Sequence, residues 1–209
     1  MRKTQLVVIF CFLLLILVTS TGCQQSKNDK NWQSLFDGKT LKGWQILPGG
    51  TWEVENGAIV GRSPEQEKRH GILLTEKRYR DFKIRLKFKV LKGNSGLYFR
   101  VDTVASGVSV NGFQAEIDEY KDIGGLYETG GRAWVVQPTT EQVREYFKVH
   151  DWNDITVSAR GNDITVHVNG VKTAELKDDP GRLEGFIGLQ LHGSMEMHVM
   201  FKDIEILMQ

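Results

Sequence analysis

Strict alternation of apolar and polar residues is the feature that most limits how this chain can fold. It is cleanest over residues 81–90, where five apolar side chains are separated by charged ones. Successive side chains of a β-strand point to opposite faces of a sheet, so this spacing predicts a strand with one buried face. We expect the charged residues on a solvated face and four of the apolar ones in the core: Phe82, Ile84, Leu86 and Phe88.

The same alternation recurs in short segments separated by glycine-rich turns. Further predicted strands cover residues 153–160, 163–169, 186–192 and 196–207. A helix is indicated only at residues 140–146, capped by Thr139 or Thr140. Many short strands with turn signals between them predict an all-β sandwich or barrel, and not an α/β fold.

One predicted strand, residues 112–120, carries polar side chains at every second position. Gln114, Glu116 and Asp118 share a face, and the apolar residues between them point towards the core. Burying such polar groups is costly unless solvent or a ligand meets them. A polar, concave sheet face is a common way to hold a sugar, and two other segments supply polar residues in the same phase: Tyr98 and Arg100, and Gln190 and His192.

The amino terminus predicts export. A positive start precedes an apolar run from Leu6 to Val18, which is too short for a membrane span and matches the core of a signal peptide. Small residues precede Cys23 as in a bacterial lipoprotein cleavage site, although Ser20 stands where leucine is usual. We expect a signal peptide over residues 1–22 and lipid on Cys23, with an ordinary secretory peptide cut nearby as the alternative.

Three regions follow from this reading: the signal peptide, a polar tether over residues 23–31 and a folded domain over residues 32–209. Cys11 would be removed and Cys23 lipidated, so the mature domain would have neither a disulfide nor a thiolate metal site. No acidic run follows Cys23, which favours a membrane anchor facing the periplasm. Removing Arg2 and Lys3 lowers the formal net charge from +1 to about −1, and without a basic cluster no nucleic-acid partner is predicted.

A set of ordered motifs runs through the folded region: FDGKTLKGW (36–44), WEVENGAIVG (52–61), LLT (73–75), DFKIRLKF (81–88), GNSGLYFR (93–100), GFQAEI (112–117), GLY (125–127), WN (152–153), VNG (168–170) and IGLQLHG (187–193). Together they resemble the 3-keto-disaccharide hydrolase family over roughly residues 32–207. The resemblance implies a concanavalin A-like jelly-roll β-sandwich of two antiparallel sheets. It also implies an exported bacterial enzyme that cleaves glycosides oxidised at C3. The chain departs from many relatives at residues 133–147, where a charged, helix-forming insert replaces a proline-rich loop.

The chemistry implied by this resemblance assigns roles to the polar face. A 3-keto sugar has an acidified proton at C2, so its cleavage needs a base, an acid and a donor for the developing enolate. Glu116 is the expected base, and Asp118 is close enough to raise a carboxyl pKa. Arg100 is expected to bind the keto or enolate oxygen, and His192 to protonate the leaving group. An ion pair between Glu116 and Arg100 with no catalytic role is the simpler alternative.

Substrate binding is assigned to polar and aromatic side chains of the same face: Asn94, Gln114, Gln190, Tyr98, Tyr127 and Trp134. Four other tryptophans are expected in the core: Trp32, Trp44, Trp52 and Trp152. His167 and His198 are expected to be exposed polar positions, whereas His70 and His150 lie in loops with no evident partner. No metal-ligand spacing and no cofactor motif is evident. A structural calcium, which jelly rolls often carry, is not indicated by the sequence.

Two alternatives remain open. A non-catalytic carbohydrate-binding lipoprotein would use the same polar face and aromatic residues. A retaining endoglucanase would need the motif Glu-x-Asp-x-x-Glu, and Lys121 stands where its second glutamate belongs. The identity of the glycoside and the oligomeric state are left open.

Overall fold

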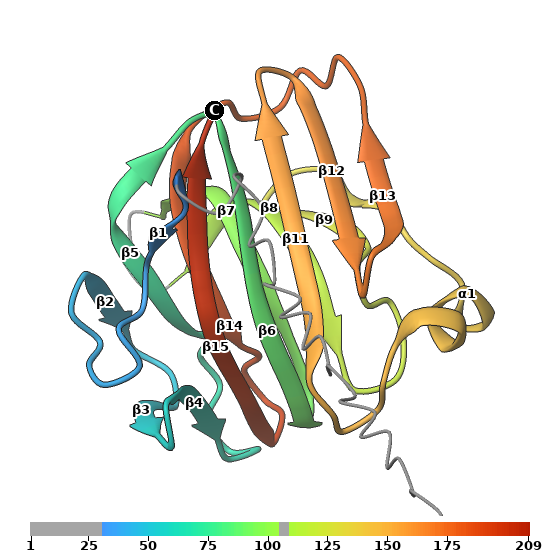
Figure 1. Cartoon of the computed structure of the whole chain (residues 1–209). Helices are drawn as coiled ribbons and strands as arrows, with labels where there is room; N and C mark the ends of the chain where they lie inside the picture. The colour runs from blue at the N-terminus through green and yellow to red at the C-terminus, as the bar shows by residue number, and fades with distance from the viewer. Residues whose placement is uncertain (1–30, 105–108) are drawn as a thin grey trace, which may run out of the picture. The chain divides into compact units, whose positions relative to one another are not determined.

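Two antiparallel β-sheets, packed face to face, make up this computed structural model, which describes residues 31–104 and 109–209 (Figure 1). The predicted all-β sandwich is therefore confirmed. The signal peptide, Cys23 and all but the last residue of the tether lie outside the described residues. Within the described part, no helix is both long and apolar enough to cross a membrane.

The first sheet has eight strands. In spatial order they are β13 (Val171–Leu176), β12 (Asp163–Val168), β11 (Asn153–Arg160), β6 (Phe82–Lys92), β15 (Met197–Met208), β4 (Ala58–Ser63) and β3 (Thr51–Glu55), with β1 (Gln33–Ser34) paired to β15. The two hairpins at one edge have the turns that the sequence predicted. Asn169 and Gly170, which join β12 to β13, both adopt positive φ angles of 49° and 84°.

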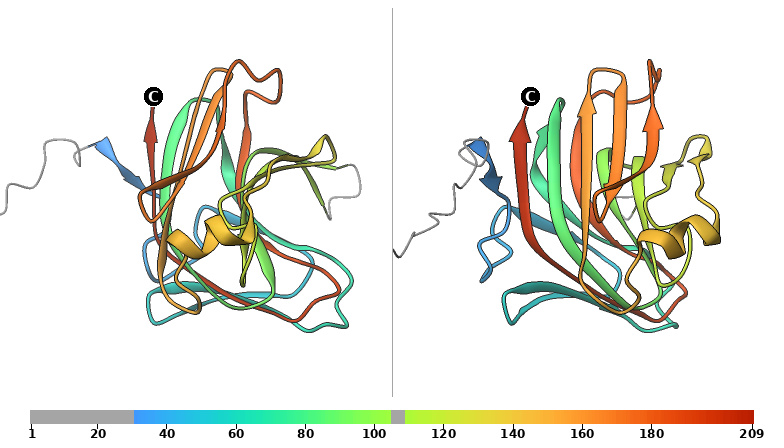
Figure 2. Two further views of the ribbon diagram at one scale, coloured as in Figure 1. Left: turned by 90° about the vertical axis from the view of Figure 1, so that its right-hand side faces the viewer. Right: turned by 45° about the vertical axis from the view of Figure 1, so that its right-hand side comes forward.

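The second sheet has seven strands and carries the polar face. In spatial order they are β10 (Ala133–Val136), β9 (Leu126–Thr129), β8 (Val110–Asp118), β7 (Asn94–Thr103), β14 (Gly185–Leu191), β5 (Gly71–Tyr79) and β2 (Trp44–Leu47). Strand β7 lies between β8 and β14, although β14 is distant from both in sequence. The views in Figure 2 show the two sheets as separate layers.

The core lies between the sheets and follows the alternation of the sequence. Phe82, Ile84, Leu86 and Phe88 of β6 are at most 2 % exposed, as predicted. The second sheet contributes the apolar residues that alternate with its polar ones, including Phe99, Phe113, Ala115, Ile117, Leu189 and Leu191. Burial of one face of each sheet therefore fixes which side chains of β7, β8 and β14 turn outward.

The helix α1 (Thr140–Tyr146) is the one helix of the described residues, where the sequence predicted it. Thr139 is its N-cap and forms a capping box with Gln142, and Val143 and Tyr146 are buried. The Tyr146 hydroxyl donates to the Ile123 carbonyl at 2.7 Å. The helix is thus docked against the segment that follows β8.

The tryptophans divide into two groups. Trp44 and Trp52 are buried as predicted. The prediction is wrong for Trp32 and Trp152, which are only partly buried. The Arg85 guanidinium lies 4.2 Å from the ring centre of Trp32, and the Lys202 ammonium 4.2 Å from that of Trp152. These rings pack under cationic side chains instead of entering the core.

Candidate functional site

A cavity of about 450 Å³ opens on the outer face of the seven-stranded sheet. Nine of the ten residues that the sequence assigned to the site line it: Asn94, Tyr98, Gln114, Glu116, Asp118, Tyr127, Trp134, Gln190 and His192. The tenth, Arg100, does not. The predicted convergence of β7, β8 and β14 is therefore found, except for Arg100. His70, which the sequence did not assign to the site, also lines the cavity.

The register between β7 and β8 brings the central polar residues together. Asn94 lies opposite Asp118, Gly96 opposite Glu116, and Tyr98 opposite Gln114. Gly96 has no side chain to fill the space above it, and the Gln114 side chain occupies that space. A Cβ atom at Gly96 would lie 2.5 Å from Gln114 Cγ, so glycine is required for this packing.

Glu116 is the most buried carboxyl group of the cavity, at 5 % exposure. The Asn94 amide donates to Glu116 Oε1 and, at 3.1 Å, to Asp118 Oδ2. The Gln114 amide donates to Glu116 Oε2 at 2.9 Å. Both oxygens of Glu116 therefore have amide partners, and Asn94 links the two carboxyl groups.

Burial raises the pKa of Glu116 from its ordinary value of 4.5 to about 8. The hydrogen bond from Asn94 opposes this shift, and the negative charge of Asp118 adds to it. Glu116 consequently titrates close to neutral pH. A carboxylate with so high a pKa is a much stronger base than an ordinary one.

A chain of side-chain hydrogen bonds continues from Glu116 across the sheet. The Gln114 amide also donates to Gln190 Oε1 at 3.0 Å, and the Gln190 amide donates to the Tyr98 hydroxyl at 3.1 Å. Tyr98 Oη lies 3.3 Å from Thr129 Oγ1. Burial raises the pKa of Tyr98, so its hydroxyl stays protonated. These bonds hold the polar side chains of four strands, β7, β8, β9 and β14, in fixed positions.

Two histidines lie together at the cavity, and sequence reasoning identified only one of them. The rings of His70 and His192 meet edge to face, with centroids 4.6 Å apart. His70 was expected to be a loop residue with no evident partner; it does lie in a loop, but it has a partner that the sequence did not reveal. It immediately precedes β5, and only the long-range pairing of β5 with β14 brings it to His192. No local feature of the sequence signals that contact.

Tyr127 and Trp134 form the aromatic wall of the cavity. Their ring centroids are 5.3 Å apart in an edge-to-face arrangement, and Trp134 lies opposite Tyr127 in the pairing of β9 with β10. Both rings are partly exposed, as a surface that receives a ligand must be. The flat CH face of a pyranose ring packs well on such aromatic rings.

Arg100 is the exception, and its predicted role is wrong. The pairing of β7 with β8 shifts register between Phe99 and Asp102, and Arg100 has a φ angle of +50°. A bulge of this kind inverts the alternation, so the side chain turns away from the cavity. At 1 % exposure, the guanidinium donates to three main-chain carbonyls, of Arg80, Gly161 and Arg182. Arg100 thus links three loops through hydrogen bonds: the one after β5, the one between β11 and β12, and the one before β14.

The carboxyl groups after Glu116 do not form a retaining-glycosidase pair at the predicted spacing. Lys121 lines the cavity where the motif needs a glutamate. Glu119 instead accepts hydrogen bonds from the Gly93 N–H at 3.2 Å and the Tyr120 hydroxyl at 2.5 Å. Glu119 Oε1 also lies 3.2 Å from His150 Nε2, so His150 has a partner that the sequence did not reveal.

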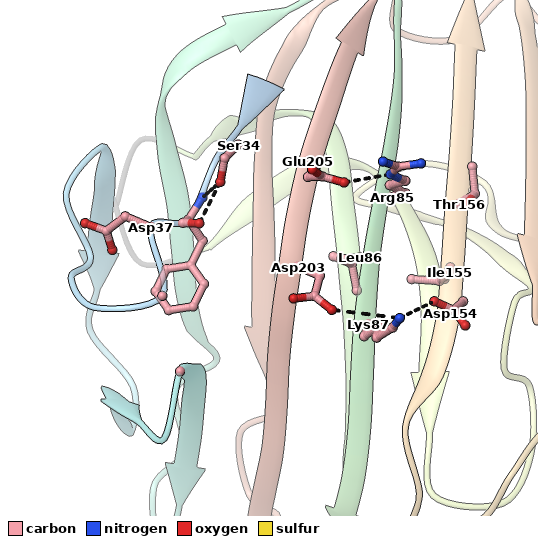
Figure 3. Close-up of a pocket in the computed structure, with 13 residues that line it drawn as sticks. Ser34, Asp37, Arg85, Leu86, Lys87, Asp154, Ile155, Thr156, Asp203 and Glu205 are labelled. Carbon is pink, nitrogen blue, oxygen red and sulfur yellow. Dashed lines mark hydrogen bonds and ion pairs between the residues drawn. The ribbon is translucent and has the colours of Figure 1, made fainter. Parts of the chain in front are cut away.

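A second cavity, of about 580 Å³, lies on the outer face of the eight-stranded sheet (Figure 3). Both cations that line it, Arg85 and Lys87, are paired with carboxyl groups. Lys87 Nζ lies 3.5 Å from Asp154 and 3.8 Å from Asp203, and Arg85 Nε donates to Glu205 at 2.7 Å. This is the solvated, charged strand face that the alternation predicted, so we place the candidate site in the cavity of the seven-stranded sheet.

A metal centre is not evident in the part of the chain that the structure describes. No three side chains among its His, Cys, Asp and Glu residues are grouped to hold a metal ion.

Solved structures of similar fold include two carbohydrate-related proteins. A candidate glycosyl hydrolase from Parabacteroides distasonis ATCC 8503 is 21 % identical, with a TM-score of 0.65 over 87 % of this chain and 95 % of that one. The carbohydrate binding module CBM66 from Bacillus subtilis is 20 % identical, with a TM-score of 0.62 over 79 % and 95 %. A Bacillus subtilis protein with a galectin-like fold is 12 % identical, with a TM-score of 0.60 over 80 % and 90 %. At these identities the likeness shows the fold, which is that of the predicted jelly roll.

Sequence comparison identifies the family. A search of curated proteins gave no match. The family model of the 3-keto-alpha-glucoside-1,2-lyase-like domain matches residues 31–207, which include both sheets and the whole cavity. The chain therefore belongs to the family of 3-keto-alpha-glucoside-1,2-lyase-like domains.

Proposed function

We propose that this protein cleaves glycosides whose sugar ring is oxidised at C3, by removal of the C2 proton, elimination and hydration. The observation that supports this most is Glu116, a buried carboxyl group whose pKa is raised to about 8 inside a sugar-sized cavity. Removal of a proton next to a ketone needs such a base, whereas an unoxidised glycoside offers no comparably acidic proton at C2.

The proposed reaction has three steps. The ionised Glu116 accepts the C2 proton, and the electron pair of the C2–H bond moves towards C3, which leaves an enolate oxygen. The enolate then re-forms the ketone, a double bond forms between C1 and C2, and the C1–O bond breaks. His192, once protonated, donates a proton to the departing oxygen, and water adds across the new double bond.

The remaining cavity residues supply binding and position. Gln114 donates a hydrogen bond to Gln190, and the Asn94 amide donates to both Glu116 and Asp118. Fixed amides of this kind orient sugar hydroxyl groups at little entropic cost. The Tyr127–Trp134 wall is placed to stack on the ring.

The test is the turnover of a 3-keto-glucoside by the wild-type protein and by Glu116→Gln. The variant keeps the size of the side chain and should lower kcat by roughly 10²-fold or more, the contribution of a general base. Glu205→Gln, the same substitution on the outer face of the other sheet, is the matched control and should leave kcat unchanged. In the wild-type protein kcat/KM should rise with pH up to about 8, because only ionised Glu116 accepts a proton. Equal kcat values for the two variants would contradict the role of Glu116.

The second candidate is a non-catalytic carbohydrate-binding protein. The amide chain from Gln114 to Tyr98 and the aromatic wall would bind a sugar whether or not Glu116 reacts. The carbohydrate binding module among the similar folds is consistent with this use of the sheet. Sugar binding without turnover of either oxidised or unoxidised glycosides would favour this candidate.

We also propose that the protein is exported and anchored through lipid on Cys23, facing the periplasm. The proposal rests on the apolar run from Leu6 to Val18, the small residues before Cys23 and the polar tether after it. Mass spectrometry of the membrane fraction tests it. A mature protein that begins at lipidated Cys23 is expected, and an unmodified Cys23 or another amino terminus would contradict the anchor.

A further inference from the structure

A single glycine contacts both histidines of the cavity. The Gly193 N–H lies 3.2 Å from His70 Nδ1, and the Gly193 carbonyl oxygen lies 2.7 Å from His192 Nδ1. Gly193 follows His192 directly and lies just beyond β14, whereas His70 lies just before β5. The main chain of one residue therefore bonds the same ring nitrogen, Nδ1, on two different side chains.

These two contacts determine which nitrogen of each ring carries hydrogen. A main-chain N–H can only donate, so His70 Nδ1 must accept, and the hydrogen of the neutral His70 ring must be on Nε2. A carbonyl oxygen can only accept, so His192 Nδ1 must carry hydrogen, which leaves a lone pair on Nε2 of the neutral ring. The two rings thus have opposite tautomers, with His70 Nε2 a donor and His192 Nε2 an acceptor.

His70 is held in the neutral state by its surroundings. A second donor, the Gln190 amide, lies 3.5 Å from His70 Nδ1. Burial lowers the pKa of His70, and a positive charge on the adjacent His192 would lower it further. A proton on Nδ1 would also break the bond with the Gly193 N–H. His70 is therefore a neutral imidazole around and above neutral pH.

The donor nitrogen of His70 is not used by any group of the described chain. His70 lines the cavity together with Glu116 and His192. Within residues 31–104 and 109–209, His70 Nε2 has no hydrogen-bond partner, whereas its Nδ1 has two. The position that the enolate oxygen requires, a hydrogen-bond donor near the base, was assigned to Arg100 from the sequence. Arg100 is occupied elsewhere, so that position needs another residue.

We propose that His70 supplies the hydrogen-bond donor for the enolate oxygen. Its Nε2–H, fixed by Gly193, donates a hydrogen bond to the C3 carbonyl oxygen of the substrate. The proposal rests on the proposed function. As Glu116 takes the C2 proton, negative charge gathers on the C3 oxygen, and the bond from His70 strengthens. The proton stays on His70 throughout, and the bond weakens again when the ketone re-forms. Such a donor acts mainly in the transition state, where it is worth most.

Two measurements on the full chain test this assignment. Nitrogen-15 NMR of labelled histidines, assigned through His70→Phe and His192→Phe, reports the tautomer of each ring without any substrate. Near neutral pH we expect hydrogen on Nε2 of His70, and on Nδ1 of His192 in its neutral form. Hydrogen on Nδ1 of His70, or a doubly protonated His70 ring, would overturn the proposal.

The kinetic test uses a 3-keto-glucoside with three variants. His70→Phe removes the donor and should lower kcat by about 10²-fold or more, with a smaller change in KM, as expected for loss of an enolate donor. His70→Gln keeps an N–H near the position of Nε2 and should recover part of that loss. His167→Phe is the matched control, because His167 lies on the other sheet, and it should behave as the wild type.

The outcomes separate this inference from the proposed function. If the wild type turns over the 3-keto-glucoside and His70→Phe does so equally fast, the assignment of His70 is overturned and the proposed function stands. If the wild type turns over unoxidised glucosides and not their 3-keto forms, both fail. A loss of kcat in His70→Phe with partial recovery in His70→Gln supports the donor role.

Discussion

Replacing Glu116 with glutamine should stabilise the folded protein at alkaline pH while it removes the proposed base. Burial raises the pKa of Glu116 from 4.5 to about 8. The folded protein thus keeps this proton up to about pH 8, whereas the unfolded chain releases it above about pH 4.5. Between these values the unfolded state binds fewer protons, so the free energy of unfolding of the wild type falls as pH rises.

The size of this loss follows from the difference in pKa. At about 1.36 kcal/mol for each pKa unit, the interval from 4.5 to about 8 corresponds to a total of about 5 kcal/mol, of which about 3 kcal/mol is lost by pH 7. Glutamine is neutral at every pH and, like the protonated acid, has one oxygen that accepts and one group that donates hydrogen bonds. The advantage of Glu116→Gln should therefore grow from about pH 4.5 to about pH 8 and then level off.

The assay is urea unfolding of wild type, Glu116→Gln and Glu205→Gln at about pH 5, about pH 7 and about pH 9. Glu205 is partly exposed and paired with Arg85, so its variant should show no gain that grows with pH. The difference between Glu116→Gln and wild type should increase by several kcal/mol across the series. A difference that stays constant with pH would refute the buried, proton-retaining state of Glu116.

Three further substitutions test other parts of the account. Arg100→Met should lower the free energy of unfolding by about 3–5 kcal/mol, since it leaves buried carbonyls unpaired, and should not change KM; chemical denaturation and kinetics check this. Gly96→Ala should displace the Gln114 amide and reduce sugar affinity and kcat with a folded structure retained, as measured by calorimetry and circular dichroism. Trp134→Ala should raise KM by up to about tenfold with little change in kcat, whereas an unchanged KM would exclude stacking on Tyr127 and Trp134.

The regular strands could be predicted from the sequence because their alternation is uninterrupted. In β6 the period of two runs from Phe82 to Val90, and in β8 it runs from Phe113 to Asp118. Burial of Ile117 therefore fixed the outward direction of Gln114, Glu116 and Asp118. The short helix was also predictable, since the capping pattern is local in sequence.

The errors arose where the structure depends on contacts between distant segments. The bulge in β7 gives Arg100 a positive φ angle and inverts the alternation, and nothing in the surrounding residues signals it. His70 reaches the cavity through the pairing of β5 with β14 and the contact with Gly193, which is 123 positions later. Trp32 and Trp152 are large aromatic residues of the kind that usually enters a core, yet cationic side chains on the sheet surface cover their rings.

The central claim is that Glu116 removes a C2 proton that only oxidation at C3 makes acidic. The most direct test compares turnover of one glucoside and its 3-keto form by the wild type and by Glu116→Gln under identical conditions. The account predicts that the wild type turns over the 3-keto form far faster than the parent, and that Glu116→Gln loses roughly 10²-fold or more of that rate. Equal rates on the oxidised and unoxidised substrates would contradict it.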